Sequence, residues 1–505
     1  MSPDSRAVEV ITSLGVLVGE QRDGVVRFLG VPYAAPPVNS LRWRAPQPVA
    51  PWSGPRAARS FAPTCPQPPA AGPTFVSAER SQRQDEDCLY LNIWTGEPDP
   101  AAPRPVMVWL HGGGFRNGSG SETWYDGAAL ARKGVVLVTL NYRLGALGGF
   151  VHPQLEPESP LGTSGNYGLL DQVAALQWVR DHIAGFGGDP GNVTIFGQSA
   201  GAASVRALLE APCARGLFHR AIQQSGGFVS AALPGPGSLN SGYADKLRIG
   251  QLLQQRLGAD SLEALRACPA AAVVTAGDAR MPRSNPAMRW WPTADGKLLP
   301  RTVGQDVAVD TADVPLLLGH TANEANVLVA SFGARPMMYA GMTPGVLGRA
   351  AFPLFREHPP WRPASAWRGL ETLFTTMIFL EPAWEMACQL ARLGRPPFVY
   401  HFSRIAPARR DPRVLANHTA EIPYMFGNLP AGGGYEERDA ALSEAMQDAW
   451  VAFARKGDPN CRGVAEWPAF DPGAGQIIDF AETPGRSNYP AGIVFDALRR
   501  RRSAP

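Results

Sequence analysis

The sequence predicts an α/β protein built on a large, mostly parallel sheet, and two observations carry that prediction. The runs 106–110 and 135–140 are continuously apolar, which is typical of strands buried on both faces. A run at helical spacing, 169–183, separates them from a third apolar run at 193–196. Strands that alternate with helices in this way indicate parallel βαβ units flanked by helices.

Further runs extend the predicted sheet in both directions along the chain. Strands are predicted at 24–32, 89–95, 221–224, 314–318, 397–402 and 477–480, and helices at 202–209 and 440–456. The pattern weakens into Pro, Gly and aromatic residues at about 228–301 and 332–384, which we interpret as insertions over one end of the sheet. Because no repeat or long linker divides the chain, we expect one domain over residues 1–505.

Composition excludes several classes of protein. The 505 residues carry 47 Lys+Arg against 44 Asp+Glu, a net charge of +3, and 45% are hydrophobic, which excludes intrinsic disorder. A charge this small does not indicate a nucleic-acid partner, and we interpret the basic cluster at 499–502 as a solvated tail. We therefore expect a globular protein that binds no nucleic acid.

Targeting and metal-binding signals are also missing from the sequence. No apolar stretch approaches the roughly 18 to 20 residues of a membrane helix, so no membrane span is expected. Asp4, Arg6 and Glu9 interrupt the N-terminus where a signal peptide needs an apolar core, which predicts a cytoplasmic protein. The six cysteines and eight histidines show no metal-ligand spacing, so no metal site is expected.

The segment 197–201, with the sequence GQSAG, joins the predicted strand 193–196 to the predicted helix 202–209. A nucleophilic serine needs such a sharp turn to raise its hydroxyl above the sheet. Glycines two residues to either side leave room for the neighbouring strand and helix. The sequence therefore predicts that Ser199 is a nucleophile, and the alternative is a glycine-rich turn with an idle serine.

A second glycine-rich segment, HGGGF at 111–115, follows the apolar run 106–110 directly. Consecutive glycines let backbone N–H groups point into a cavity without obstruction, as an oxyanion hole requires. We predict that the N–H groups of Gly113, Gly114 and Ala200 form this hole. A Walker-type phosphate loop is excluded because no Lys-Ser/Thr pair follows the glycines.

A serine nucleophile needs a carboxylate and a histidine, which in this architecture follow it along the chain in that order. His418 meets the requirement for the base, because it lies in a loop after the predicted strand 397–402. Glu324 is the best-placed acid, since it closely follows the run 314–318 and so reaches the carboxyl edge of the sheet. Position alone leaves these rivals open: Asp295, Asp306, Asp310 and Asp313.

Six motifs together give the chain a family resemblance from about residue 15 to 480. They are FLGVPYA at 28–34, EDCLYLN at 86–92, HGGGF at 111–115, NYGLLDQ at 166–172, FGGDP at 186–190 and GQSAG at 197–201. The chain resembles the type-B carboxylesterases, an α/β-hydrolase family that includes bacterial para-nitrobenzyl-type esterases and the cholinesterases. The resemblance implies an α/β-hydrolase fold, hydrolysis of a small carboxylic ester through an acyl-enzyme, and a triad of Ser199, Glu324 and His418. It implies no cofactor, and we expect a monomer or weak homo-oligomer.

The resemblance also implies structural roles for other residues. It implies a disulfide between Cys65 and Cys88, although a reducing cytoplasm opposes such a bond. The resemblance further implies an ion pair between Arg42 and Glu86. Ser225 matches a family position near the triad, where we interpret it as a core hydroxyl. The sequence departs from the family at Gln198, where glutamate is usual, and this removes a buried charge beside the nucleophile.

Two alternatives and the substrate stay open at this stage. The same triad serves an acyltransferase or amidase, and a cholinesterase-like domain without activity serves as a recognition module. Aromatic and methionine side chains in the two insertions either line an apolar gorge or pack in the core: Trp290, Trp291, Phe332, 337–339 and 374–379. Arg289 either contacts an anionic substrate or lies on the surface.

Overall fold

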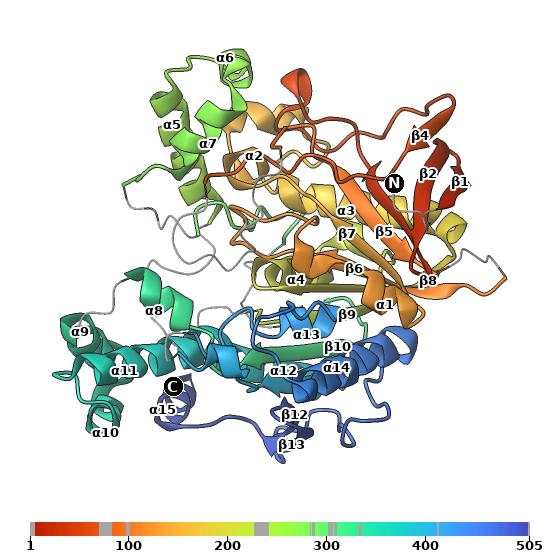
Figure 1. The fold of residues 1–505 in the computed structure, drawn as a ribbon. Helices are drawn as coiled ribbons and strands as arrows, with labels where there is room; N and C mark the ends of the chain where they lie inside the picture. The colour runs from red at the N-terminus through yellow and green to blue at the C-terminus, as the bar shows by residue number, and fades with distance from the viewer. Residues whose placement is uncertain are drawn as a thin grey trace.

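One sheet runs through the whole protein (Figure 1). The structure, a computed structural model, describes residues 6–69, 83–96, 101–226, 242–282, 284, 288–300, 307, 311–332, 336–411 and 414–502. Within these ranges the strand order is β1-β2-β3-β5-β7-β6-β8-β9-β10-β11-β12-β13, and β4 pairs with β2. The pairs from β7 to β12 are parallel, whereas both ends of the sheet are antiparallel.

The strands are β1 Arg6–Thr12, β2 Gly15–Arg22, β3 Val25–Pro32, β4 Pro55–Ala57, β5 Tyr90–Thr95, β6 Arg104–Leu110, β7 Val136–Leu140, β8 Gly188–Gln198, β9 Arg220–Gln224, β10 Leu316–Thr321, β11 Phe398–Phe402, β12 Gln476–Phe480 and β13 Pro484–Asn488. All nine predicted strands are present. The sequence did not predict the antiparallel strands β1, β2 and β13, or the short β4, which pairs parallel with β2. Short, half-exposed edge strands lack the continuous apolar run that marks a buried one.

The helices are α1 Ala128–Arg132, α2 Gly145–Gly149, α3 Tyr167–His182, α4 Ala200–Glu210, α5 Tyr243–Leu257, α6 Leu262–Ala267, α7 Ala270–Asp278, α8 Asn326–Phe332, α9 Pro336–Leu347, α10 Ala351–Glu357, α11 Pro363–Thr375, α12 Glu381–Arg392, α13 Ile422–Phe426, α14 Glu437–Lys456 and α15 Ile493–Arg502. A π-helical segment, η7 Thr376–Leu380, joins α11 to α12. The three predicted helices correspond to α3, α4 and α14.

Side chains on the central strands alternate between two separate cores. On β6, Val106, Val108 and Leu110 belong to one buried cluster, whereas Met107 and Trp109 belong to the other. Helices α3 and α4 cover the first face, and α13 and α14 supply the core on the second. Both faces of β6 are therefore buried, which explains why its sequence is continuously apolar.

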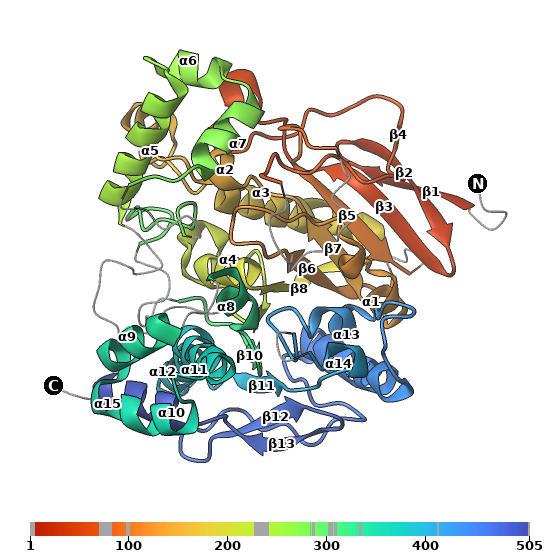
Figure 2. The ribbon, with the colours of Figure 1, turned by 60° about the vertical axis from the view of Figure 1, so that its left-hand side comes forward.

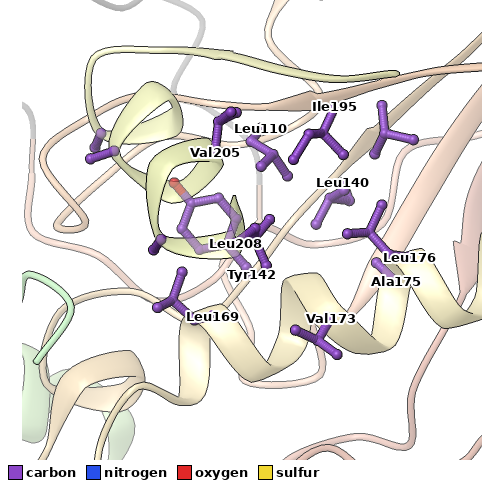
Figure 3. Packing of buried hydrophobic residues seen from close by; sticks show 14 of the residues in the cluster. Leu110, Leu140, Tyr142, Leu169, Val173, Ala175, Leu176, Ile195, Val205 and Leu208 are labelled. Atoms are coloured by element: carbon purple, nitrogen blue, oxygen red, sulfur yellow. The ribbon is translucent and has the colours of Figure 1, made fainter. Parts of the chain in front are cut away.

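Figure 3 shows the first core at close range. Leu169, Val173 and Leu176 from α3 and Leu208 from α4 point toward the strands, and each is at most 5% exposed. Burial of a leucine or valine side chain contributes about 1.5–3 kcal/mol. This packing fixes α4 against the sheet, and α4 is the helix that begins directly after Ser199.

The described parts of the two predicted insertions contain several helices. Helices α5, α6 and α7 form one group, and α9, α10 and α11 form another at the same side of the sheet (Figures 1 and 2). The second group has its own apolar core, which includes Tyr339 and Leu370. That the chain is one domain stays a prediction, and the continuous sheet supports it.

Candidate active site

Ser199 occupies a strained turn between β8 and α4. Its φ of 58° and ψ of −122° lie outside the regions that residues with a side chain prefer. A Cβ atom on Gly201 would lie 1.9 Å from the Leu110 carbonyl oxygen, and one on Gly197 would lie 2.6 Å from the Gly201 carbonyl carbon. Only glycine fits at either position, as the spacing of the motif predicted.

The glycine loop leaves the sheet beside this turn. Leu110 at the end of β6 pairs in register with Gly197 of β8, so the loop 111–114 begins next to Ser199. Gly113 has a φ of 108°, and a Cβ there would lie 2.0 Å from the Asn117 carbonyl oxygen. The local fold therefore requires glycine at this position.

The amide groups predicted to form an oxyanion hole are available as donors. Within the described residues, the N–H groups of Gly113, Gly114 and Ala200 donate to no protein acceptor. Ala200 is the first residue of α4, where an N–H has no partner inside the helix. The carbonyl of Gly113 accepts from the N–H groups of Arg116 and Asn117, which holds the loop in a tight turn.

His111 supports the glycine loop from within the core. Its ring stacks on Tyr142 at 4.2 Å between centroids, and Nδ1 lies 2.8 Å from the Gly112 carbonyl oxygen. Burial lowers the pKa of His111 to about 4, so the ring is neutral at pH 7. A buried neutral ring with this packing is a structural element of the loop.

The structure brings Glu324 and His418 together from loops 94 residues apart. Glu324 Oε2 lies 2.5 Å from His418 Nδ1, and Glu324 Oε1 accepts from the Thr321 N–H at 2.7 Å. Asn323 pairs with Asn417 in a parallel bridge, and the Asn323 N–H donates to the Ala416 carbonyl at 2.9 Å. Both carboxylate oxygens of Glu324 are therefore bonded, and its side chain is fully buried.

The rival acids have other partners or lie outside the described residues. Asp295 accepts from the Asn166 side chain and from two backbone N–H groups of its own turn. Asp313 forms an ion pair with Arg395 at 3.0 Å. Asp306 and Asp310 lie outside the described part of the chain.

Gln198 contacts the histidine loop directly. Its side-chain Nε2 donates to the His418 carbonyl oxygen at 2.5 Å, and the residue is only 2% exposed. A glutamate here would offer only acceptors to that carbonyl when ionised, so the amide suits this contact better. The Phe379 ring of η7 packs against the His418 ring at 5.0 Å between centroids.

Two further buried carboxyl groups surround the Glu324 side chain, and neither was found from the sequence. Burial, followed by the charge of Glu324, raises the pKa of Glu421 to about 8 and that of Glu371 to about 7. Glu421 accepts from the Gln224 side chain at 3.0 Å and from the Tyr400 hydroxyl at 2.8 Å. No local sequence pattern marks either residue, because the partners that bury them come from distant segments.

Replacing Glu421 with glutamine should change how stability depends on pH. The native carboxyl has a raised pKa, so it stabilises the fold only while protonated, and that contribution falls as pH rises from about 4.5 through 8. Glu421→Gln lacks this loss, and its free energy of unfolding relative to wild type should rise by about 1 kcal/mol between pH 7 and 8.5. Urea unfolding of both proteins at the two pH values measures this difference. Lys246 titrates in the same interval, but its contribution to the free energy of unfolding is the same in both proteins and cancels in the difference between them. A pH-independent difference would contradict the prediction.

Cys65 and Cys88, for which the family resemblance implies a disulfide, form no covalent bond in the structure. Both residues are buried free thiols. Their mutual hydrogen bond, together with burial, holds the pKa of Cys88 well above its usual value. Cys65 Sγ accepts from the Leu144 N–H at 3.2 Å, so packing and hydrogen bonds hold this region without a covalent bond.

The other residues that the sequence singled out are mainly structural. Arg42 forms the implied ion pair with Glu86, and Ser225 is buried at 1% exposure, consistent with a core hydroxyl. Arg289 is buried, and its guanidinium donates to the carbonyls of Gly277 and Ala279, so it does not lie on the surface.

Candidate lining residues divide between the core and the site. Trp290 is 7% exposed and Tyr339 is fully buried in the core, whereas Met337 is 87% exposed. Trp291 packs against Phe115, at the end of the glycine loop, with 5.3 Å between centroids. Phe374 packs partly buried against the core of the helical insertion. The side chain of Phe332 lies outside the described residues.

Two negative findings apply to the described ranges only. No three His, Cys, Asp or Glu side chains there lie close enough to hold a metal ion. No helix there has both the length and the apolar character needed to cross a membrane.

A mostly parallel sheet with a serine at the sharp turn between a central strand and helix places the chain among the α/β hydrolases. The family model described as "Carboxylesterase family" matches residues 6–491. The chain belongs to this family and is a carboxylic-ester hydrolase.

Curated relatives and solved structures agree with this assignment. The chain is 37% identical to a fumonisin B1 esterase of Sphingopyxis macrogoltabida, covering 94% of this chain and 86% of the relative. It is 35% identical to a para-nitrobenzyl esterase of Bacillus subtilis strain 168, covering 91% of this chain and 92% of the relative. A carboxylesterase structure from Geobacillus stearothermophilus matches with a TM-score of 0.81 at 33% identity, covering 98% of this chain and 99% of that structure. The predicted α/β-hydrolase fold and esterase class are thus confirmed.

Proposed function

We propose that the chain is a serine carboxylesterase that works through an acyl-enzyme, with Ser199 as nucleophile, His418 as base and Glu324 as the orienting acid. The observation that carries the proposal is the buried contact between His418 Nδ1 and Glu324 Oε2, 2.5 Å long. This contact leaves Nε2 of the same ring as the nitrogen able to accept the serine proton. The strained turn at Ser199 supports the nucleophile role, because such a turn presents the hydroxyl beyond the carboxyl end of the central strand β8.

In acylation, His418 Nε2 takes the Ser199 hydroxyl proton while Oγ attacks the ester carbonyl carbon. The carbonyl oxygen becomes an oxyanion that accepts from the N–H groups of Gly113, Gly114 and Ala200. Glu324 stabilises the imidazolium. The bond from the carbonyl carbon to the alcohol oxygen then breaks, and His418 returns its proton to the leaving alcohol.

Deacylation repeats these steps with water. His418 Nε2 takes a proton from the water, whose oxygen attacks the acyl carbon, and the same three N–H groups hold the second oxyanion. The bond to Ser199 Oγ breaks, Oγ regains its proton from His418, and the carboxylic acid leaves. Ser199, Glu324 and His418 return to their starting states, so no cofactor takes part.

A small, mostly uncharged ester fits the surroundings of the site best. Among the described residues, two aromatic side chains of the insertions lie against the site: Phe379 packs on His418, and Trp291 packs on Phe115. The one arginine that was a candidate for binding an anion, Arg289, is bonded to backbone carbonyls instead. Para-nitrobenzyl esters, which give the Bacillus subtilis relative its name, are of this uncharged kind.

Labelling and product analysis test the proposal. A fluorophosphonate probe should modify the protein once, at Ser199, and peptide mass spectrometry identifies the site. With a short-chain aryl ester, free acid should form at the same rate whether or not an alcohol or amine acceptor is added. Transfer of the acyl group to the acceptor would indicate an acyltransferase, and absence of labelling and turnover would indicate a silent recognition module.

A further inference from the structure

Glu371 lies directly behind the loop that carries Glu324, and the proposed catalytic cycle does not use it. It is on α11, inside the second insertion, and is 9% exposed. The Thr375 hydroxyl donates to Glu371 Oε1 at 2.7 Å, and the Asn323 side chain donates to the same carboxyl. The insertion therefore places a carboxyl group against the loop that carries the acid.

These contacts continue into both triad loops. Thr375 Oγ1 accepts from the Ala325 N–H at 2.9 Å, so the residues on both sides of Glu324 are tied to α11. The Asn323 N–H in turn donates to the Ala416 carbonyl, two residues before His418. Glu371 thus anchors an array of bonds that spans the acid loop and the histidine loop.

We propose that Glu371 is a positioning residue for ester hydrolysis. Through Thr375 and Asn323 it fixes the Glu324 loop against the His418 loop, and in its ionised form it adds negative charge behind Glu324 that favours the imidazolium of the transition state. The inference rests on the proposed function, because it assumes that His418 becomes protonated during turnover.

The charge of Glu371 depends on pH in the working range. Burial, and after it the charge of Glu324, raises its pKa to about 7, so the carboxyl is mostly neutral at pH 6 and mostly ionised at pH 8. Glu324 is the charged group that faces it from the acid loop. Arg368 on its own helix is exposed, and Arg409 reaches only to Asn417 in the histidine loop. Glu421 also interacts with Glu324.

The first test compares kcat/KM for a short-chain aryl ester in wild type and Glu371→Gln from pH 5.5 to 9. Glutamine keeps the size of the side chain but cannot ionise. The wild type should be about twofold more active below pH 6 and about tenfold more active above pH 8, because only it gains the charge. Glu357→Gln is the matched control, since Glu357 is an exposed glutamate of the same insertion, and its ratio to wild type should stay near one.

Two further variants separate the charge from the anchoring bonds. Glu371→Asp keeps the charge, so its kcat/KM should still rise with pH relative to Glu371→Gln. Thr375→Val keeps the carboxyl but removes the acceptor for the Ala325 N–H, and it should lower kcat about three- to tenfold both at pH 5.5 and at pH 9, on either side of the Glu371 titration. These variants remain informative where Glu371→Gln folds poorly.

The outcomes separate this inference from the proposed function. If fluorophosphonate labels Ser199 but the ratio of wild type to Glu371→Gln is constant across pH, Glu371 is only structural and the inference fails. A ratio of one at every pH also overturns it. If wild-type hydrolysis does not require Ser199 at all, the proposed function itself fails.

Discussion

Ser199→Ala should abolish ester hydrolysis and leave the fold intact. The change removes Oγ, without which no acyl-enzyme forms, and loss of a serine nucleophile costs on the order of 10⁴- to 10⁶-fold in kcat. The φ of 58° at this position strains serine and alanine alike, because both carry a Cβ atom, so the strain of the turn should not change. Steady-state hydrolysis of a short-chain aryl ester, with circular dichroism as a check on folding, measures the effect.

Ser204→Ala is the matched control for that experiment. Ser204 lies on the same helix, α4, is fully buried and accepts from the Gln172 side chain at 3.0 Å. Its loss should lower stability by about 1 kcal/mol but leave kcat within twofold of wild type. Equal activity in Ser199→Ala and wild type would exclude the acyl-enzyme mechanism, whereas equal losses in both variants would point to damage to α4.

The central sheet was predictable from the sequence because its strands meet two cores. Val108 and Trp109 on β6 face opposite clusters, so no polar residue is tolerated along the run and the strand is unmistakable. The glycines around Ser199 were equally informative, since the backbone of Leu110 excludes any side chain at Gly201. In both cases a local steric requirement restricts which residue types can occupy neighbouring positions, so it is visible in the sequence.

The environment of the proposed triad was not predictable in the same way. Gln198 reaches a carbonyl 220 residues further along the chain, and Glu371 meets a loop 48 residues before it. Each looks like an ordinary polar residue until the fold brings its partner near. The helices of the insertions were missed because Gly and Pro obscure their period, as at Pro344 inside α9.

Gly201, two residues after the proposed nucleophile Ser199, provides the second large effect, on stability rather than on chemistry. Gly201→Ala should destabilise the protein by more than about 3 kcal/mol, because the new Cβ would overlap the Leu110 carbonyl oxygen at 1.9 Å and lie 3.0 Å from that of His111. Leu110 ends a central strand paired on both sides, so it cannot move away without breaking the β6–β8 register. Urea unfolding and the yield of soluble protein measure the loss.

Gly341→Ala tests whether that loss comes from the overlap rather than from replacing a helical glycine. Gly341 lies inside α9, and a Cβ there would meet no atom within 4 Å. Alanine should therefore stabilise the protein by about 0.5–1 kcal/mol through its higher helix propensity. If Gly201→Ala unfolds at the same urea concentration as wild type, α4 must be able to shift away from β6. In that case the close approach of helix and strand would not be what fixes the turn that carries Ser199.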